Sequence, residues 1–173
     1  MRSSITVMLL PALVAASTLG YAADQKLNHR DAKAIQNLAE ANRAEVEAGK
    51  LALQKAQSED VKKFAQHMVD DHGKMLDEVQ QLAQSKGVKL PDGVGVKNKA
   101  QEKKLEMASD DKFDKDYMAA MVKDHQADLK ELQKISKSAK DPDLKAAADK
   151  AATTVKQHFE MAKQMASGPR AGK

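Results

Sequence analysis

Two segments of the chain place a histidine within the same pattern of residues. Residues 64–76 read FAQHMVDDHGKML and residues 117–129 read YMAAMVKDHQADL, so both contain aromatic-x3-Met-Val-x-Asp-His-x3-Leu. His72 and His125 each follow a methionine by four residues. Residues four apart share one face of a helix, and here that face is apolar. We therefore predict that both imidazoles point into the protein core.

Two further ionisable residues interrupt apolar stripes elsewhere. His158 falls within the stripe of residues 144–165, and Glu45 falls within that of residues 35–56. Short turns near residues 57 and 140 would place Glu45 opposite His72 and His158 opposite His125. In parallel helices, His72 and His125 would both lie about 20 Å from the helix start. The four residues are therefore predicted to share one layer.

A buried layer of this composition needs partners, because unpaired imidazole and carboxylate groups are costly to bury. Imidazole and carboxylate ligands suit Cu, Zn, Fe or Ni. Nearby methionines could add soft sulfur ligands for Cu(I): chiefly Met68 and Met121, and also Met75, Met161 and Met165. Two interpretations stay open. The layer is either a transition-metal site or a Glu-His hydrogen-bonded cluster that only specifies the fold.

Three other polar residues are candidates for supporting roles. Asp71 and Asp124 each precede a candidate histidine by one residue, which turns them about 100° around the helix. We expect them to act as hydrogen-bond partners around the site rather than as ligands. Tyr117 either donates its hydroxyl into the cluster or serves as a core aromatic. His67 and His29 are expected on the surface.

The composition favours an all-α domain that can position these residues. The 173 residues are 42% hydrophobic, 31% charged and only 3% aromatic, with no Cys or Trp. Strong helix formers dominate, and β-branched and aromatic residues are too sparse for an extensive sheet. Without Cys, the chain has no thiolate metal ligands, cysteine nucleophiles or disulfides.

Apolar spacings of three and four predict four long helices, over about residues 30–56, 59–86, 110–139 and 142–165. A long connection between the second and third helices contains Pro91, Gly93 and a short helical piece over about 97–108. We predict a ferritin-like four-helix bundle in which this connection crosses the bundle, so that the second and third helices run parallel. The alternative is a connection folded back locally, which would give up-and-down topology.

The first 22 residues are predicted to be a secretory signal peptide. Arg2 precedes an apolar run over residues 5–19, and small residues precede a cleavage site after Ala22. No second apolar segment is long enough to span a bilayer, so the mature chain, residues 23–173, should have no transmembrane segment. The short signal favours export to a bacterial periplasm.

The charge distribution and the absence of known catalytic motifs argue against several classes of function. The 29 basic residues are interleaved with 25 acidic ones, which argues against nucleic-acid binding despite a net charge of +4. No histidine follows a glutamate at the Glu-x-x-His spacing of ferritin-like di-iron centres. Phosphate-binding loops and serine-hydrolase motifs are also missing from the sequence. The sequence therefore favours a binding protein and leaves enzymatic activity undecided.

The motifs on all four predicted helices resemble the DUF4142 family. The resemblance rests on AEVEAGKLAL, FAQHMVDDHGKML, FDKDYMAAMVKDH and DPDLKAAADKAATTVKQH, and it covers nearly the whole mature chain. It implies an exported bacterial protein of ferritin-like bundle fold, of a kind often labelled an outer-membrane protein. By position, the family's recurrent polar residues correspond to Glu45, Asp71, His72, Tyr117, Asp124, His125 and His158.

Together these observations predict a periplasmic bundle that binds copper, zinc or iron through Glu45, His72, His125 and His158, in metal handling or envelope stress. The competing hypothesis is a structural or interaction module, with a protein partner or a second copy of the chain contacting its charged faces.

Overall fold

The structure is a computed structural model that describes residues 27–168. Within this range it contains no strand and five helices: α1 His29–Lys55, α2 Glu59–Ser85, α3 Val96–Glu106, α4 Asp110–Ser138 and α5 Pro142–Ser167. The all-α prediction is confirmed, including the short helix α3 in the long connection. The predicted signal peptide, residues 1–22, lies outside the described residues.

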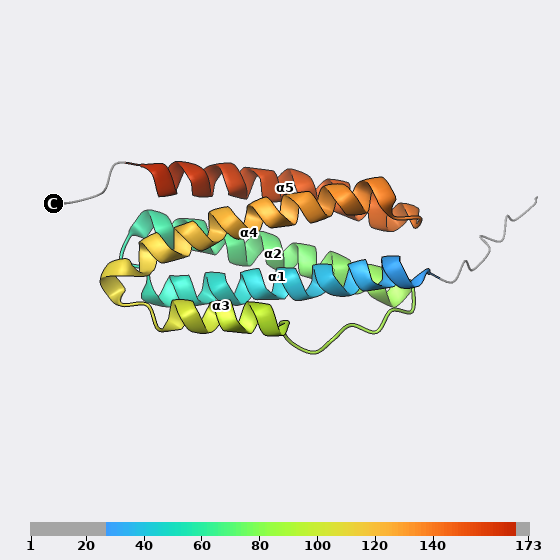
Figure 1. Cartoon of the computed structure of the whole chain (residues 1–173), viewed down its shortest axis with the longest axis horizontal. Coiled ribbons are helices and arrows are strands. Elements are labelled where there is room, and N and C mark those ends of the chain that lie inside the picture. The colour runs from blue at the N-terminus through green and yellow to red at the C-terminus, as the bar shows by residue number, and fades with distance from the viewer. Residues whose placement is uncertain (1–26, 169–173) are drawn as a thin grey trace, which may run out of the picture.

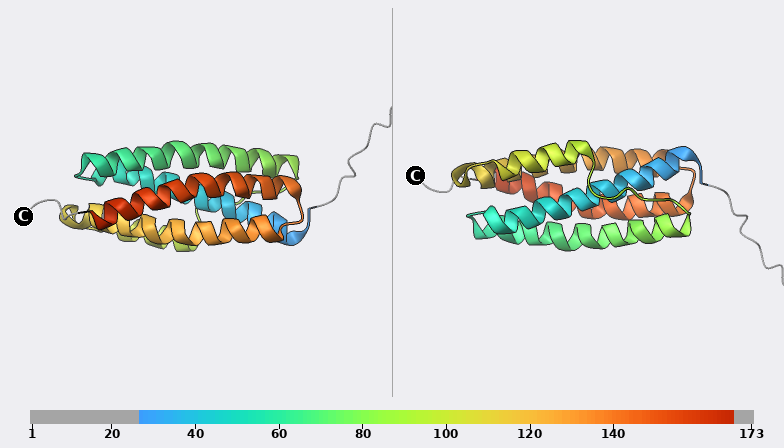
Figure 2. Two further views of the ribbon diagram at one scale, coloured as in Figure 1. Left: turned by 90° about the horizontal axis from the view of Figure 1, so that it is seen from above. Right: turned by 90° about the horizontal axis from the view of Figure 1, so that it is seen from below.

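Two antiparallel hairpins, α1–α2 and α4–α5, lie side by side along a common axis (Figure 1). The chain leaves α2 at one end of the bundle and returns along α1 through residues 86–95 and α3, before α4 begins at the other end (Figures 1 and 2). Helices α2 and α4 therefore run in the same direction. The predicted crossover is confirmed, and the alternative of an up-and-down bundle is wrong.

The helix ends follow local chemistry. Asp141 caps α5 by accepting a hydrogen bond from the Leu144 backbone N–H at 2.9 Å, and Pro142 occupies the first turn. Gly87 ends α2 with φ +64°, a left-handed conformation that glycine adopts readily. Ser58 stands at the N-cap of α2 as predicted, but its side chain makes no capping hydrogen bond.

Each hairpin turn is held by a carboxylate from the other hairpin. Asp31, near the start of α1, accepts hydrogen bonds from the backbone N–H groups of Lys140 and Asp141 at 2.8 and 2.9 Å. Asp114, near the start of α4, accepts from those of Gln57 and Ser58 at 3.1 and 2.8 Å. These reciprocal contacts satisfy backbone donors at both ends of the bundle and fix the parallel register of the two hairpins.

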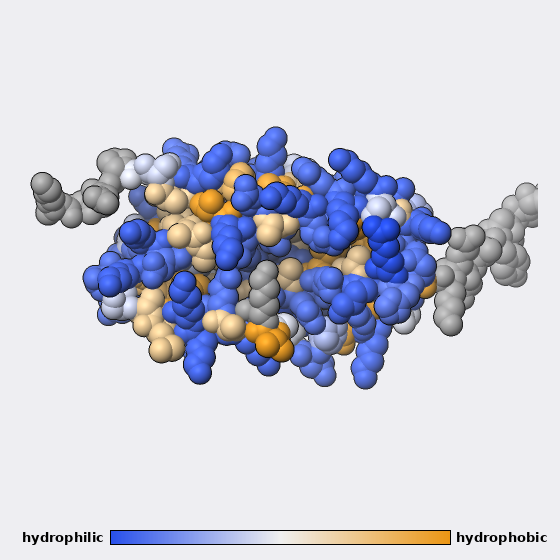
Figure 3. All heavy atoms as spheres, in the orientation of Figure 1, coloured by the Kyte–Doolittle hydropathy of each residue, from blue (hydrophilic) through white to orange (hydrophobic). Residues whose placement is uncertain are grey.

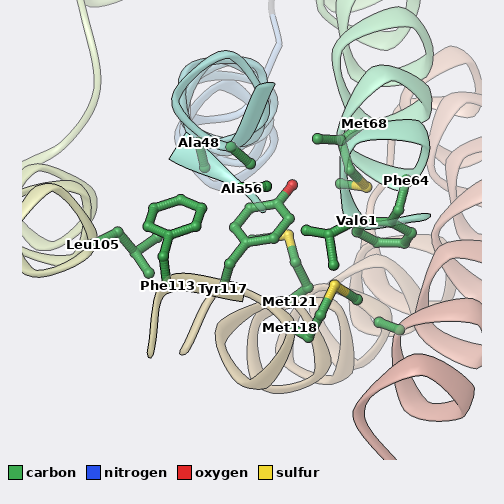
Figure 4. Packing of buried hydrophobic residues seen from close by; sticks show 13 residues of the cluster. Ala48, Ala56, Val61, Phe64, Met68, Leu105, Phe113, Tyr117, Met118 and Met121 are labelled. Carbon is green, nitrogen blue, oxygen red and sulfur yellow. The ribbon is translucent and has the colours of Figure 1, made fainter. Parts of the chain in front are cut away.

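The apolar core is divided into two clusters. The first, shown in Figure 4, contains the stacked rings of Phe113 and Tyr117, with centroids 6.0 Å apart, and the Phe64 ring edge-on to Tyr117 at 6.2 Å. The second is built around residues such as Ile35 and Leu144 towards the other end. The predicted histidines belong to neither cluster, so a polar layer interrupts the core.

The surface is predominantly charged and polar. The face seen in Figure 3 carries hydrophilic side chains with small apolar patches scattered between them. Among the described helices, none is both long enough and apolar enough to cross a membrane.

Candidate metal centre

Three imidazoles from three helices meet in the middle of the bundle. His72 on α2, His125 on α4 and His158 on α5 are at most 2% exposed. Their ring centroids form a nearly equilateral triangle, with separations of 5.5 Å for His72–His125, 5.3 Å for His72–His158 and 5.6 Å for His125–His158. The parallel arrangement of α2 and α4 brings the two repeated Asp-His segments to the same depth.

One nitrogen of each ring is oriented by an oxygen acceptor. His72 Nδ1 lies 2.9 Å from Asn42 Oδ1, His125 Nδ1 lies 3.0 Å from the Met121 carbonyl, and His158 Nε2 lies 3.1 Å from Asp71 Oδ2. Since the Asn42 amide nitrogen donates to the Leu38 carbonyl, its oxygen faces His72. A neutral imidazole that donates from one nitrogen presents a lone pair at the other.

The opposite nitrogen of each ring has no hydrogen-bond partner among the described residues. These atoms, His72 Nε2, His125 Nε2 and His158 Nδ1, are fully buried. The three histidines offer ligand atoms that lie within 4.8 Å of one another. Ligating histidines in metalloproteins typically donate their other N–H to a carboxylate or carbonyl, as all three do here in neutral form. The donor set therefore fits a transition-metal ion.

Burial keeps the imidazoles neutral. Burial lowers the pKa of His72 well below its usual value, and the neighbouring His125 and His158 lower it further. Burial also lowers the pKa of His125 to about 4. The pKa of His158 is lowered by burial as well, although its hydrogen bond to Asp71 opposes the shift. Neutral imidazole is the form that binds metal, so at neutral pH no proton has to leave these rings first.

Glu45 lies next to this triangle but groups with different residues. Its carboxylate, His125 and Asp128 form a second set of ligand atoms within 4.8 Å of one another. Glu45 is 7% exposed, and its Oε2 has no hydrogen-bond partner among the described residues. Burial raises the pKa of Glu45 well above its usual value, and the charges of Asp128 and Asp124 raise it further.

The other predicted polar residues take separate places. Asp71 contacts His158, whereas Asp124 accepts a hydrogen bond from Gln101 and so links α4 to α3. Tyr117 is buried in the first apolar cluster, and its hydroxyl has no hydrogen-bond partner among the described residues. In Figure 4 that hydroxyl points away from the α4 backbone, towards α1. His67 and His29 are exposed, as expected.

The five methionines suggested as soft ligands differ in how deeply they are buried. Met68 and Met121 are buried, and Met75 lines the same small cavity as His72. Met165 is half-buried. Met161 is 36% exposed, so it is the least buried of the five methionines, and its role as a soft ligand stays a prediction. It follows His158 by three residues, which turns it about 60° away from the inward direction, to the edge of the buried stripe.

Two residues of the site were missed from the sequence. Asn42 precedes Glu45 by three residues, and Asp128 follows His125 by three. Each therefore shares a helix face with a residue that was identified. Helical spacing around the known candidates was the signal that could have found both.

The fold and the buried layer define a class of protein. It is an all-α bundle of two helical hairpins joined by a crossover connection, with three inward-facing imidazoles and an adjacent carboxylate. The chain belongs to the DUF4142 family, described as a domain of unknown function, whose family model matches residues 16–165. No curated protein matches the sequence significantly.

Solved structures share this helical fold. A DUF305 fragment from Deinococcus radiodurans is similar with a TM-score of 0.72 and 9% identity, covering 81% of this chain and 97% of that one. CopM in its Cu(II)-bound form is similar with a TM-score of 0.67 and 18% identity, covering 79% and 95%. CopM in its Cu(I)-bound form gives 0.65 and 18%, covering 78% and 93%. At these identities, the similarity establishes the fold alone.

Proposed function

We propose that this protein binds a transition-metal ion through His72, His125 and His158 and serves metal handling in the periplasm. The observation that carries the proposal is that each of three histidines, whose ligand atoms lie within 4.8 Å of one another, has a buried ring nitrogen with no hydrogen-bond partner among the described residues. Each such nitrogen is an acceptor whose burial costs about 1–3 kcal/mol if unsatisfied. A single cation between the rings would satisfy all three.

A purely structural hydrogen-bonded cluster explains this arrangement less well. In such a cluster the rings would alternate as donors and acceptors, so that inward nitrogens pair with one another. Here the outward nitrogen of each ring is already held by an oxygen acceptor, which leaves three inward lone pairs in the neutral rings. The orienting contacts thus favour the metal site over a cluster that only specifies the fold.

The donor set suits copper, zinc or iron. Three imidazole nitrogens leave further coordination positions open for a carboxylate, water or a thioether. Met68 and Met121 supply buried sulfur in the same part of the bundle, and the sequence contains no cysteine. The solved CopM structures of similar fold hold Cu(II) and Cu(I), which makes copper the first ion to test.

Calorimetric titration of the metal-free, untagged protein with Cu²⁺, Zn²⁺ and Fe²⁺ tests the proposal. We expect one ion to bind per chain, and each His→Leu change in the triangle to weaken binding at least about tenfold. His29→Gln, an exposed histidine at the start of α1, is the matched control and should bind as the wild type does. Binding to the triple His→Leu variant that equals wild-type binding would refute the site.

The proposed periplasmic location can be tested separately. We expect the exported protein to begin at or next to Ala23, because the first 22 residues have the pattern of a signal peptide. Mass spectrometry of protein from the periplasmic fraction would show this N-terminus. Recovery of the chain with an intact Met1 in that fraction would contradict cleavage.

A further inference from the structure

A cleft of about 80 Å³ between α1, α3 and α4 is lined by Glu45 and Asp128, the two carboxylates that group with His125. Four of its lining residues are acidic: Glu45, Glu102, Asp124 and Asp128. Carboxylates lining one cleft raise the local concentration of cations. The cleft thus offers a cation a direct approach to Glu45, which borders the layer.

Two polar atoms at this edge are buried and unsatisfied. Glu45 Oε2 and His125 Nε2 have no hydrogen-bond partner among the described residues, and both residues are more than nine-tenths buried. Glu45, His125 and Asp128 offer ligand atoms that lie within 4.8 Å of one another. An oxygen-rich set with one imidazole suits a divalent ion such as Zn²⁺ or Fe²⁺.

This second set shares His125 with the three-imidazole set. His125 Nδ1 donates to the Met121 carbonyl, so the ring has only one lone pair, at Nε2, with which to ligate an ion. One nitrogen cannot serve two ions at once. The two sets therefore compete for His125, and an ion in one excludes a fully ligated ion in the other.

Asp128 is close to both sets of ligands. It lines the acidic cleft, and it also lines a cavity of about 160 Å³ that is bordered by His72 and Asn42. An ion held by Glu45, Asp128 and His125 is thus next to the remaining imidazoles. Movement into the triangle would keep His125 as a ligand and replace the two carboxylates with His72 and His158, and Glu45, whose pKa is raised, would take up a proton as the ion leaves.

We propose that Glu45, Asp128 and His125 form a second, transient site for a divalent cation, through which the ion enters from the acidic cleft before it reaches the three imidazoles. This inference rests on the proposed metal-binding function. It assigns Glu45 and Asp128 to loading the ion, and it predicts that one chain holds one ion at saturation.

Complementary variants, titrated with Zn²⁺ alone, separate the two sites. His72→Leu/His158→Leu removes two imidazoles and retains the second set. We expect this variant to bind one Zn²⁺ per chain at least about tenfold more weakly than the wild type, and to lose binding when Asp128→Asn is added. Absence of binding in the variant, with helical circular dichroism intact, would overturn the second site.

Glu45→Gln/Asp128→Asn retains the three imidazoles and should still bind one Zn²⁺. If this variant binds none while His72→Leu/His158→Leu does, the proposed three-histidine site fails and the second site stands. Two Zn²⁺ per wild-type chain, both lost in His125→Leu, would overturn the competition for His125.

Loading kinetics test the entry route without disturbing the imidazoles. Zn²⁺ released from a chromophoric chelator can be followed by absorbance as it enters the metal-free protein. We expect Asp128→Asn to load about tenfold more slowly, because a cleft carboxylate is lost. Asp116→Asn, an exposed carboxylate on the same helix, should load at the wild-type rate. Equal rates for Asp128→Asn and the wild type would refute the entry role.

Discussion

The buried imidazoles should make the metal-free protein sensitive to mild acid. Burial lowers the pKa of His72, His125 and His158, so near and below pH 6.5 the folded state binds fewer protons than the unfolded state. The stability that these groups contribute is fully present above the unfolded pKa of about 6.5. It is lost as the pH falls towards the lowered pKa values of the folded state.

The pKa of His125 gives the size of this loss of stability. Its folded pKa is about 4, against an ordinary value of 6.5. Proton linkage then gives a loss of about 2 kcal/mol at pH 5, relative to neutral pH, and about 3 kcal/mol at pH 4. The lowered pKa values of His72 and His158 act in the same direction. For a domain whose total stability is roughly 5–15 kcal/mol, this loss is large.

Glu45 acts in the opposite direction and must be removed from the measurement. Its pKa is raised by burial, so the folded state binds more protons than the unfolded state above about pH 4.5. Stability from this group therefore falls as the pH rises. The Glu45→Gln variant removes this opposing contribution, so that the titration of the imidazoles between about pH 5 and pH 7.5 can be measured.

Urea unfolding in the presence of a chelator, followed by circular dichroism, measures the effect. We expect Glu45→Gln to lose at least about 2 kcal/mol between pH 7.5 and pH 5, relative to the same variant with His72, His125 and His158 all changed to leucine. The reference variant subtracts the titration of surface groups. If the two free energies of unfolding changed in parallel, the imidazoles would not be held neutral by burial and the reasoning would be refuted.

Three further predictions concern packing and capping, and urea unfolding measures all of them. Gly73→Ala should stabilise the protein by about 0.5–1 kcal/mol, because a Cβ there meets nothing within 4 Å and alanine favours helix. Gly49→Ala should instead destabilise it by about 1 kcal/mol, because its Cβ would lie 2.9 Å from Val69 Cγ2 and 3.0 Å from the Ala65 carbonyl oxygen. Asp31→Ala should cost about 2 kcal/mol or more, since two backbone donors at the α4–α5 turn lose their acceptor, and Asp31→Asn should cost less.

Most of the fold could be predicted because its determinants are local. Apolar periodicity defined the long helices, and Asp141-Pro142 and Gly87 marked helix ends with recognisable cap chemistry. The reciprocal capping by Asp31 and Asp114 could not be predicted. Each carboxylate acts on backbone more than 50 residues away, and no local pattern encodes that pairing.

The site was predictable to the extent that helix faces determine it. Inward-facing histidines follow from spacing, and the hairpin turns give their depth, so the triangle of imidazoles lies where the sequence placed it. The division of the layer into two sets does not follow from spacing. It depends on how α1 packs against α4, because Glu45 on α1 groups with His125 and Asp128 on α4, and side-chain packing between helices is not encoded in local spacing.

Asn42 is the residue whose function depends most on this tertiary detail. Its amide nitrogen donates to the Leu38 carbonyl at 2.8 Å, which turns its oxygen towards His72. That oxygen can only accept, so the neutral His72 ring must carry its proton on Nδ1 and keep the Nε2 lone pair directed at the other imidazoles. Asn42 therefore selects the tautomer that can ligate a metal.

Changing Asn42 should consequently alter metal affinity without removing a ligand. We expect Asn42→Leu to weaken Zn²⁺ or Cu²⁺ binding about 10–100-fold, the usual effect of removing a group that orients a ligating histidine. Asn42→Asp retains the acceptor and adds negative charge, so it should bind at least as tightly as the wild type. Competition with a chelator of known affinity measures both variants, and circular dichroism checks that each is folded. Equal weakening in Asn42→Leu and Asn42→Asp would mean that Asn42 supports packing alone, because a role in orienting His72 requires the acceptor variant to restore binding.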